Sequence, residues 1–351
     1  MHLRHGAWWT FALVPLLVFG TWITWRTAKL ANRQAAEPGV GTAQLPQGRL
    51  WYPVAPPTVV GRLRAFFLPG EFQRDAALAA TGPRLPLIVY FGGWPGTGID
   101  NNELIRALVG EGFVVAATNA EPDAVEPMDF SSAAAYENTL RRADTRARLL
   151  ARKAVDLIAS LESLDRLDPQ GRFTGRLDMS HVGILGYSFG GAVAAQAAWL
   201  DGRFRAVVNL DGWSFADAAV EGIQQPYLYI SDDTPMPTAA DLASSNPDRR
   251  YTSELTQNDQ PRLLHNLARH AGIYLLLSGT NHSSFVDRGL LSRVREFFGF
   301  PPDSGTRVQE ILRAYVPAFF RSRLQGVESP LLRGRVSRFP EVRFPPLESV
   351  P

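Results

Sequence analysis

An α/β fold with a mostly parallel, doubly wound sheet is the fold class that this sequence predicts, from three features. Short apolar runs of strand length recur along the chain and alternate with longer helix-compatible stretches. The runs are apolar throughout, which is typical of parallel strands covered on both faces. The chain has 351 residues, of which 45% are hydrophobic, enough to bury one large core. We therefore expect one large domain with right-handed crossovers between its strands.

Six apolar runs supply the expected parallel strands, and helices are expected between and after them. The strands are residues 87–91, 113–118, 182–185, 206–210, 227–230 and 273–277. The helices are residues 102–110, 143–164, 190–200, 261–270, 290–298 and 306–324. Residues 50–54 and 61–68 are further predicted to pair as antiparallel strands at a sheet edge, with Pro56 and Pro57 between them.

The N-terminal region predicts a transmembrane helix. Residues 7–25 carry no charge and approach the roughly 20 apolar residues that span a bilayer. Tryptophans lie at both ends of the run, as in the aromatic belts of membrane helices. The alternatives are a cleaved signal peptide, followed by secretion, and a buried core helix. We expect an uncleaved single-pass anchor, with the remainder of the chain on the extracytoplasmic side of the membrane.

Four regions follow from this pattern. Residues 1–30 are the expected anchor or signal segment, and residues 31–48, rich in Ala, Gly, Pro and Gln, are the expected linker. Residues 49–326 are the expected catalytic domain. Residues 327–351 form a tail in which arginines are interspersed with prolines, and we expect it to be solvated.

Composition excludes several classes of function. The chain has no cysteine, so disulfides, thiolate nucleophiles and cysteine-ligated metals are absent. The net charge is only +2, and several of the positive charges lie near the N-terminus. Because the remainder is close to neutral, nucleic acid is not expected as a partner.

A G-x-S-x-G pattern marks the candidate nucleophile. Residues 186–190 read Gly-Tyr-Ser-Phe-Gly, between a predicted strand and a run of small residues that suits a helix. Glycines on both sides of Ser188 would let the chain turn sharply and present its hydroxyl at the tip. A turn rich in Gly and Ser is often only a turn, so the strand before it and the helix after it give the motif its weight.

A serine needs a base, and His282 is the candidate. The chain has six histidines, and His282 is the one that follows a predicted strand late in the chain, in a loop reading Gly-Thr-Asn-His-Ser-Ser-Phe. That is where a base would reach the carboxyl edge of the sheet. The alternative is a loop histidine bonded only to its neighbours.

The base in turn needs a carboxylate, for which two positions compete. Asp211 directly follows the strand at residues 206–210, whereas Asp232 and Asp233 end the next strand. Each could equally be an ordinary loop aspartate. We expect Asp211 to be the orienting acid, because Gly212 permits a turn that aims the carboxylate toward His282.

An oxyanion would need two N–H donors. We expect the backbone of Phe189, which follows the nucleophile, and that of Trp94 in the glycine-rich loop at residues 92–98. This loop is not a phosphate loop, because Ile99 stands where that motif requires lysine. No metal or organic cofactor is predicted.

The segments FGGWPG, GYSFGG, NLDGW and GTNHSSF together resemble the platelet-activating-factor acetylhydrolase group of α/β-hydrolases, near polyester hydrolases and dienelactone-hydrolase-like esterases. The resemblance extends over about residues 50–298. It implies the α/β-hydrolase fold and a catalytic triad formed by Ser188, Asp211 and His282. One departure is that Gly92-Gly93 stands where the group often has His-Gly.

The resemblance implies a serine hydrolase that cleaves carboxylic esters through an acyl-enzyme, acting on a short-acyl phospholipid or lipid-like ester. Two alternatives remain open from the sequence. One is a peptidase or lactone hydrolase on the same fold, because fold and triad do not select the leaving group. The other is a catalytically silent, membrane-tethered binding module.

Overall fold

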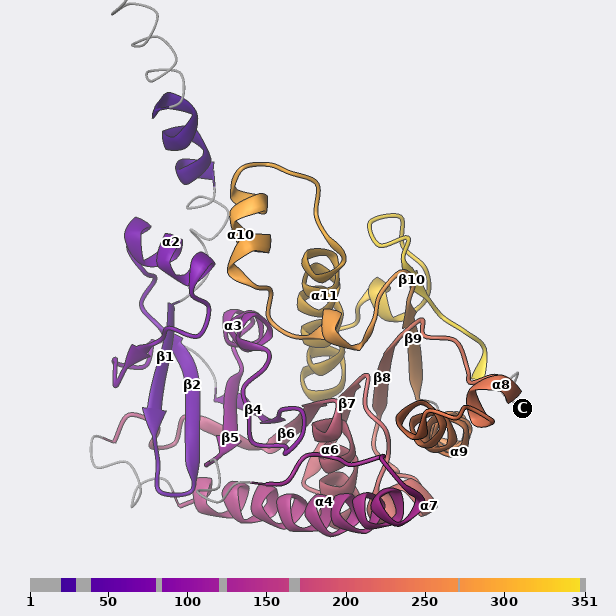
Figure 1. Cartoon of the computed structure of the whole chain (residues 1–351). Coiled ribbons are helices and arrows are strands. Elements are labelled where there is room, and N and C mark those ends of the chain that lie inside the picture. The colour runs from indigo at the N-terminus through magenta and orange to yellow at the C-terminus, as the bar shows by residue number, and fades with distance from the viewer. Residues whose placement is uncertain are drawn as a thin grey trace, which may run out of the picture.

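The computed structural model describes residues 20–29, 39–79, 84–119, 125–163, 171–270 and 272–347. In this part of the chain one ten-stranded sheet crosses the molecule, with the order β10-β9-β8-β7-β6-β4-β5-β2-β1-β3. Helices cover both of its faces (Figure 1). The strands are β1 (Gly39–Gln44), β2 (Gly48–Val54), β3 (Gln73–Arg74), β4 (Leu85–Phe91), β5 (Val114–Thr118), β6 (Leu177–Tyr187), β7 (Phe204–Leu210), β8 (Tyr227–Asp232), β9 (Ile273–Leu277) and β10 (Val342–Arg343).

The six strands predicted as parallel form the centre of this sheet. Strands β5, β4, β6, β7, β8 and β9 pair in parallel with their neighbours. Their residues are almost all buried, as expected for strands that are covered on both sides. The carboxyl ends of parallel strands meet at one edge of a sheet, so the loops after β4, β6, β7 and β9 share that edge.

Two helical layers enclose two hydrophobic cores. Helices α4 (Ala133–Leu161), α6 (Phe189–Leu200), α7 (Ala216–Glu221) and α9 (Pro247–Arg269) pack on one face of the sheet. Helices α3 (Asn102–Gly110) and α11 (Ser304–Gln325) pack on the other. The remaining elements are a helix at residues 20–29, α2 (Val59–Phe67), α8 (Ala239–Leu242), α10 (Leu290–Phe297) and the 3-10 helices η1 (His282–Phe285) and η2 (Pro330–Leu332). The doubly wound α/β prediction is therefore correct.

The prediction of a strand at residues 61–68 is wrong, because this segment belongs to α2. Thr58 caps the helix by accepting a hydrogen bond from the backbone N–H of Gly61, at 3.2 Å. The apolar residues of the segment recur every three to four positions, which suits one face of a helix. Within α2, Phe66 is buried, whereas Val60 is 73% exposed.

Strand β2 pairs instead with β1, which lies in the segment expected to be a linker. The pairing is antiparallel and runs from Gly39 opposite Val54 to Gln44 opposite Arg49. Val40 is buried in the core, so this part of the segment belongs to the domain. Its residues are mostly small and polar, so the sequence did not predict this strand at the edge of the sheet.

The tail expected to be solvated also packs on the domain over its described part. Strand β10 adds antiparallel to the free edge of β9, pairing Val342 with Leu277. Phe339 and Val342 are fully buried. The tail is rich in arginine and proline, so its few apolar residues did not lead to a prediction that it packs on the domain.

Within the described ranges, no helix combines the length and the apolar character needed to cross a bilayer. Most of the charge-free run at residues 7–25 lies outside these ranges, and its end from Gly20 onward belongs to the helix at residues 20–29.

Candidate active site

Ser188 lies at the tip of a sharp turn between β6 and α6. Its backbone has φ 54° and ψ −124°, a combination that non-glycine residues seldom adopt. The turn is held by a hydrogen bond from the Ser188 N–H to the carbonyl of Leu210, at 2.9 Å. The geometry is that of a nucleophile elbow, which presents the hydroxyl at the carboxyl edge of the sheet.

The flanking glycines are required by close backbone contacts. A Cβ on Gly186 would lie 1.9 Å from the carbonyl oxygen of Gly190. A Cβ on Gly190 would lie 2.3 Å from the carbonyl oxygen of Phe91. Neither position can hold a side chain, so the G-x-S-x-G spacing follows from the packing of the elbow against β4.

His282 joins the serine to an aspartate. Its Nε2 lies 2.9 Å from Ser188 Oγ, and its Nδ1 lies 2.6 Å from Asp211 Oδ2. The three side chains come from the ends of β6, β7 and β9, and the fold brings them together across 94 positions of sequence. The Asp211 side chain is 9% exposed and that of His282 is 51% exposed, so the site opens directly to the surface.

Backbone groups fix Asp211 in place. Its Oδ1 accepts a hydrogen bond from the backbone N–H of Asp232, at 2.8 Å, and its own N–H donates to the carbonyl of Ile230. Asp211 itself has a positive φ of 57°. A Cβ on Gly212 would lie 2.1 Å from the Ser188 carbonyl oxygen, so glycine is required here for close approach to the elbow.

The two competing aspartates bond elsewhere. The Asp232 carboxylate accepts hydrogen bonds from the backbone and the hydroxyl of Thr234. Asp233 Oδ2 accepts from the backbone N–H of Gly279, at 2.7 Å. Burial, with the Asp211 charge added to it, raises the pKa of Asp232. Of the three candidates, only Asp211 bonds to His282 in the described part of the chain.

Trp94 and Phe189 are the two residues whose backbone N–H groups are predicted to stabilise an oxyanion. No described group accepts a hydrogen bond from the backbone N–H of either residue. The N–H of Gly93, by contrast, donates to Asp100 Oδ2 at 2.7 Å. The Trp94 ring meets the Phe189 ring edge to face, with centroids 4.8 Å apart. The two chain segments that carry the candidate donors therefore pack against each other.

Tyr187 is a site residue that the sequence reasoning missed. Its ring stacks on the His282 imidazole, with centroids 5.0 Å apart and 24° between the planes. Its hydroxyl donates to the backbone carbonyl of His282, at 3.2 Å. A Cβ on Gly93 would lie 3.3 Å from this ring, so Tyr187 touches the elbow, the histidine loop and the glycine-rich loop together. The signal available in the sequence was an aromatic residue directly before the nucleophile.

A second Ser-His-Asp group lies at the start of β6 and lacks the geometry of a triad. Ser180 Oγ and Asp178 Oδ2 both approach the same nitrogen of His181, Nδ1, at 3.0 and 2.6 Å. In a catalytic triad, one imidazole nitrogen contacts the serine and the other contacts the aspartate. This group is therefore a local turn network.

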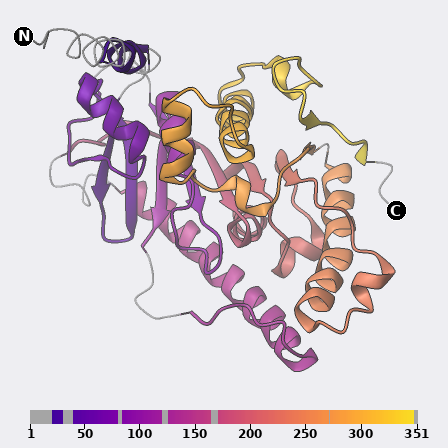
Figure 2. The same cartoon turned by 45° about the horizontal axis from the view of Figure 1, so that its top comes forward.

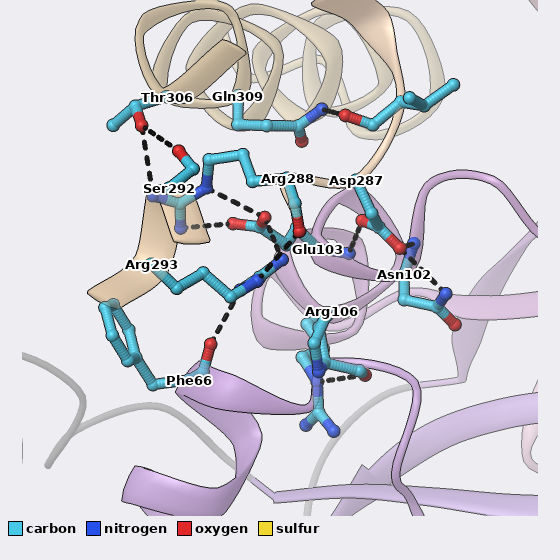
Figure 3. A network of polar contacts seen from close by, with 12 residues as sticks. Phe66, Asn102, Glu103, Arg106, Asp287, Arg288, Ser292, Arg293, Thr306 and Gln309 are labelled. Carbon is cyan, nitrogen blue, oxygen red and sulfur yellow. Dashed lines mark hydrogen bonds and ion pairs between the residues drawn. The ribbon is translucent and has the colours of Figure 1, made fainter. Parts of the chain in front are cut away.

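A polar network ties the histidine loop to α3 (Figure 3). The carboxylate of Asp287 accepts hydrogen bonds from the backbone N–H groups of Asn102 and Glu103, at 2.8 and 2.9 Å. Glu103 pairs with Arg288 and Arg293, all three buried. Burial disfavours the charge of Glu103, but bonds and charges from the two arginines outweigh it and lower its pKa. No motif in the sequence predicted this network.

Among the residues that the structure describes, no cluster of His, Asp and Glu has the arrangement of a metal site. In this arrangement a serine hydroxyl, a base and an acid are in contact at the edge of an open site. It can therefore perform chemistry in which the base activates the serine and the acid orients the base.

Known proteins are similar in sequence to part of this chain. The family profile described as platelet-activating factor acetylhydrolase, isoform II, matches residues 163–291, a span that contains Ser188, Asp211 and His282. A probable 1-alkyl-2-acetylglycerophosphocholine esterase of Arthroderma benhamiae is 29% identical over 181 residues, covering 47% of this chain and 43% of that protein. The platelet-activating factor acetylhydrolase of Cavia porcellus is 28% identical over 179 residues, covering 44% and 41%. The chain thus spans less than half the length of these relatives.

A solved structure shares the fold over most of the chain. The ferulic acid esterase from Streptomyces cinnamoneus superposes with a TM-score of 0.56 at 22% sequence identity, covering 87% of this chain and 96% of that one. Its likeness concerns the fold. Together with the family profile and the relatives, it shows that this chain resembles the platelet-activating factor acetylhydrolase group of α/β-hydrolase esterases.

Proposed function

We propose that this protein is a serine hydrolase that cleaves carboxylic esters through an acyl-enzyme on Ser188. The observation that carries the proposal is the chain of contacts from Ser188 Oγ through the two nitrogens of His282 to Asp211. This is the arrangement that turns a weak hydroxyl into a nucleophile.

In the proposed first half-reaction, Ser188 Oγ attacks the ester carbonyl carbon while His282 Nε2 takes the hydroxyl proton. Asp211 holds the imidazole through Nδ1 and stabilises the imidazolium that forms. The backbone N–H groups of Trp94 and Phe189 donate to the developing oxyanion. His282 then gives its proton to the leaving alcohol as the carbon–oxygen bond breaks, which leaves the acyl group on Ser188.

In the second half-reaction, water replaces the alcohol. His282 takes a proton from water as the water oxygen attacks the acyl carbon, and it returns that proton to Ser188 Oγ as the acid leaves. The half-exposed His282 side chain is compatible with water reaching this position. Each half-reaction begins and ends with a neutral imidazole.

We propose a short-acyl phospholipid or lipid-like ester as the substrate. The Arthroderma benhamiae relative is named as a probable esterase of 1-alkyl-2-acetylglycerophosphocholine, and the Cavia porcellus relative as an acetylhydrolase of platelet-activating factor. Beside the nucleophile, the rings of Trp94, Phe189 and Phe215 pack in a row, with centroids 4.8 and 5.8 Å apart. Apolar and aromatic side chains are typical of sites that hold the apolar part of a ligand.

We also propose that residues 7–25 anchor the protein in a membrane, with the catalytic domain on the extracytoplasmic side. The support is the charge-free sequence of this run with tryptophans at both ends. Cleavage and secretion are the alternative, and the apparent mass of the mature protein separates the two.

A fluorophosphonate probe tests the hydrolase proposal directly. The purified protein should be labelled at Ser188, and Ser188→Ala should abolish both labelling and turnover of p-nitrophenyl esters. Ser180→Ala is a matched control, because Ser180 also contacts a histidine and an aspartate but in the wrong geometry, and it should keep both. Absence of labelling on the folded protein would favour a silent binding module.

The acyl preference is tested with p-nitrophenyl esters of rising chain length and with matched amide and lactone substrates. We expect kcat/KM to fall as the acyl chain lengthens and to be far lower for the amide. Faster turnover of the amide or the lactone would point to a peptidase or a lactone hydrolase instead.

A further inference from the structure

One face of α4 supports the glycine-rich loop that carries the proposed oxyanion donor. Arg146 Nε donates a hydrogen bond to the carbonyl oxygen of Pro95, at 2.5 Å. One turn later, Leu150 packs against Gly96, where an added Cβ would lie 2.6 Å from Leu150 Cδ1. Residues four positions apart share one face of a helix. The loop therefore rests directly on α4, and position 96 leaves no room for a side chain.

Arg142, one turn before Arg146, fixes the side chain of Trp94. Its guanidinium lies over the Trp94 ring, 5.9 Å from the centroid. It also donates to the backbone carbonyl of Glu126, at 2.5 Å, and the indole Nε1 of Trp94 donates to the same carbonyl, at 3.0 Å. Residues 125–132, which contain Glu126, run back alongside α4 before that helix begins, as Figure 1 and Figure 2 show. The indole is thus tied both to α4 and to this segment.

Backbone hydrogen bonds extend the contact of Arg146 to the N–H of Trp94. The peptide group between Pro95 and Gly96 accepts the bond from Arg146 at its carbonyl. Its N–H donates in turn to the carbonyl of Gly93, at 2.5 Å. That carbonyl belongs to the trans peptide group that ends in the N–H of Trp94. Because the C=O and N–H of a trans peptide point in opposite directions, the bond at Gly93 aims the Trp94 N–H away from Gly96.

Filling the space beneath the loop would not require a charge. The buried side of α4 beside Arg146 is otherwise mostly apolar, with Ala143, Ala147, Leu150, Ala151 and Ala154. Arg146 itself is only 9% exposed, and arginine keeps its charge in proteins. Burying a charged group costs free energy unless the group is hydrogen-bonded. An apolar residue would avoid this cost, so the bond to the loop accounts for an arginine at this position.

We propose that Arg146 is a positioning residue of the oxyanion site, which orients and polarises the backbone N–H of Trp94 through two peptide groups in series. Hydrogen bonds in series strengthen one another by about 10–30% per bond. A cation that donates to the first carbonyl therefore makes the last N–H a stronger donor. The inference rests on the proposed hydrolase function, because it requires an oxyanion to form at Trp94.

A transition-state analogue tests the role of Arg146 on the full chain. A trifluoromethyl ketone adds to Ser188 and forms a tetrahedral adduct with a negatively charged oxygen, so its inhibition constant reports on the oxyanion donors. Arg146→Met removes both the bond and the charge. It should lower kcat on p-nitrophenyl acetate about tenfold with little change in KM, and weaken ketone binding by a similar factor. Arg146→Lys keeps the charge and a donor, and should recover most of both losses.

Arg172→Met is the matched control for the loss of a buried arginine. The side chain of Arg172 is 12% exposed and pairs with Asp75 at 3.0 Å, beside the edge strand β3. Its replacement should lower the melting temperature. It should leave kcat and the inhibition constant of the ketone unchanged, because Arg172 lies outside the glycine-rich loop and the face of α4 that supports it.

A second variant keeps the test decisive if Arg146→Met does not fold. Arg146→Gln can still donate to the carbonyl of Pro95 but has no charge, so kcat and ketone affinity should each fall about three- to fivefold. Full kcat in either folded variant would overturn the role of Arg146, as would a loss of kcat with unchanged ketone affinity. An unaltered protein that neither hydrolyses esters nor is labelled at Ser188 would instead refute the hydrolase function itself.

Discussion

At the residue scale, two of the strained residues lie next to the same histidine. Among the described residues, four that are not glycine have positive φ, and Ser188 and Asp211 are two of them. Each follows a central strand directly, and both contact His282. Backbone conformations of this kind cost on the order of 1–3 kcal/mol and persist where the surrounding structure enforces them. Here packing against β4 and the bond from Ser188 N–H to Leu210 supply that enforcement.

The choice of Asp211 over Asp232 gives the first prediction. Asp211→Asn removes the acceptor that orients His282, and the matching change in a Ser-His-Asp protease lowers kcat by about four orders of magnitude. Asp232→Asn keeps the backbone N–H that donates to Asp211 and should change kcat by less than about threefold. Steady-state kinetics on a p-nitrophenyl ester compare the two. A crippled Asp232→Asn beside an active, folded Asp211→Asn would refute the assignment.

Tyr187 gives the second prediction. Its ring stacks on the imidazole and its hydroxyl bonds to the backbone of His282, so it fixes the plane of the imidazole ring. Tyr187→Phe keeps the ring and loses one hydrogen bond, and should lower kcat by no more than about fivefold. Tyr187→Leu loses both, and should lower kcat about 10- to 50-fold with little change in KM.

A structural control accompanies Tyr187→Leu. Tyr315 of α11 is fully buried and its ring packs against Phe339 of the C-terminal tail, with centroids 5.7 Å apart, and Tyr315→Leu should lower thermal stability without lowering kcat. The downfield NMR signal of the proton between His282 and Asp211 should broaden in Tyr187→Leu and persist in Tyr315→Leu. Full kcat in Tyr187→Leu would show that the stacked ring has no part in catalysis.

At the element scale, α3 begins without a side-chain cap of its own. Its N-cap residue Asn101 makes no capping bond. Asp287, from the loop after β9, caps the helix instead, and its own N–H donates to the carbonyl of Asp100 at 2.7 Å. Asp100 in turn holds the N–H of Gly93. Asp287 and Asp100 thus together link a helix start, the histidine loop and the glycine-rich loop.

Asp287→Ala should therefore affect both stability and turnover, which is the third prediction. Loss of the cap should cost about 1–2 kcal/mol of unfolding free energy. Because the histidine loop loses its side-chain bonds to the start of α3, kcat should also fall by about tenfold or more. Denaturant unfolding and steady-state kinetics measure the two effects.

Asp303→Ala is the matched control for this prediction. Asp303 caps α11 by accepting from the backbone N–H of Thr306, at 2.7 Å, and lies outside the proposed catalytic loops. Its replacement should cost a similar unfolding free energy and leave kcat unchanged. Equal kcat losses in the two variants would mean that Asp287 matters only for stability.

At the scale of the whole molecule, a buried carboxyl makes stability depend on pH. Asp259 of α9 is 4% exposed, and burial raises its pKa from 3.8 to about 7, opposed by a bond from the Ser214 N–H and the charge of Arg262. The folded state therefore binds more protons than the unfolded chain between these two values. The stabilisation that comes from the protonated Asp259 in the folded state is fully present below pH 3.8 and is lost as the pH rises to about 7.

Asp259→Asn gives the fourth prediction. The asparagine side chain cannot ionise, so the variant should become more stable relative to the unaltered protein as the pH rises from 5 to 8. The relative gain in unfolding free energy should be on the order of 1–4 kcal/mol, and the difference in melting temperature should rise with it. Asp241→Asn is the control. The pKa of Asp241 is lowered to about 2 by bonds from Thr238, assisted by Arg249, so its effect should be constant over the same range. Parallel pH profiles for Asp259→Asn and the unaltered protein would rule out ionisation of Asp259 in this range.

The central architecture and the order of the candidate residues along it can be predicted from local features of the sequence. Six uninterrupted apolar runs became six parallel strands, because burial on both faces requires apolar residues at every position. The glycines around Ser188 were readable because only glycine fits such close backbone contacts. Both signals are local, so no knowledge of the remaining chain was needed.

Tertiary structure decided what depends on partners distant in the sequence. The strand β1 and the strand β10 have few apolar residues and form because each completes an edge of an existing sheet. Helix α2 replaced a predicted strand because a cap and neighbouring helices stabilise it there. Three contacts of the site join segments that lie between 71 and 185 positions apart. They are the bond of Asp211 rather than Asp232 to His282, the stacking of Tyr187 on His282 and the cap that Asp287 gives to α3. Local composition cannot specify such distances, since they are set by how the strands are ordered in the sheet.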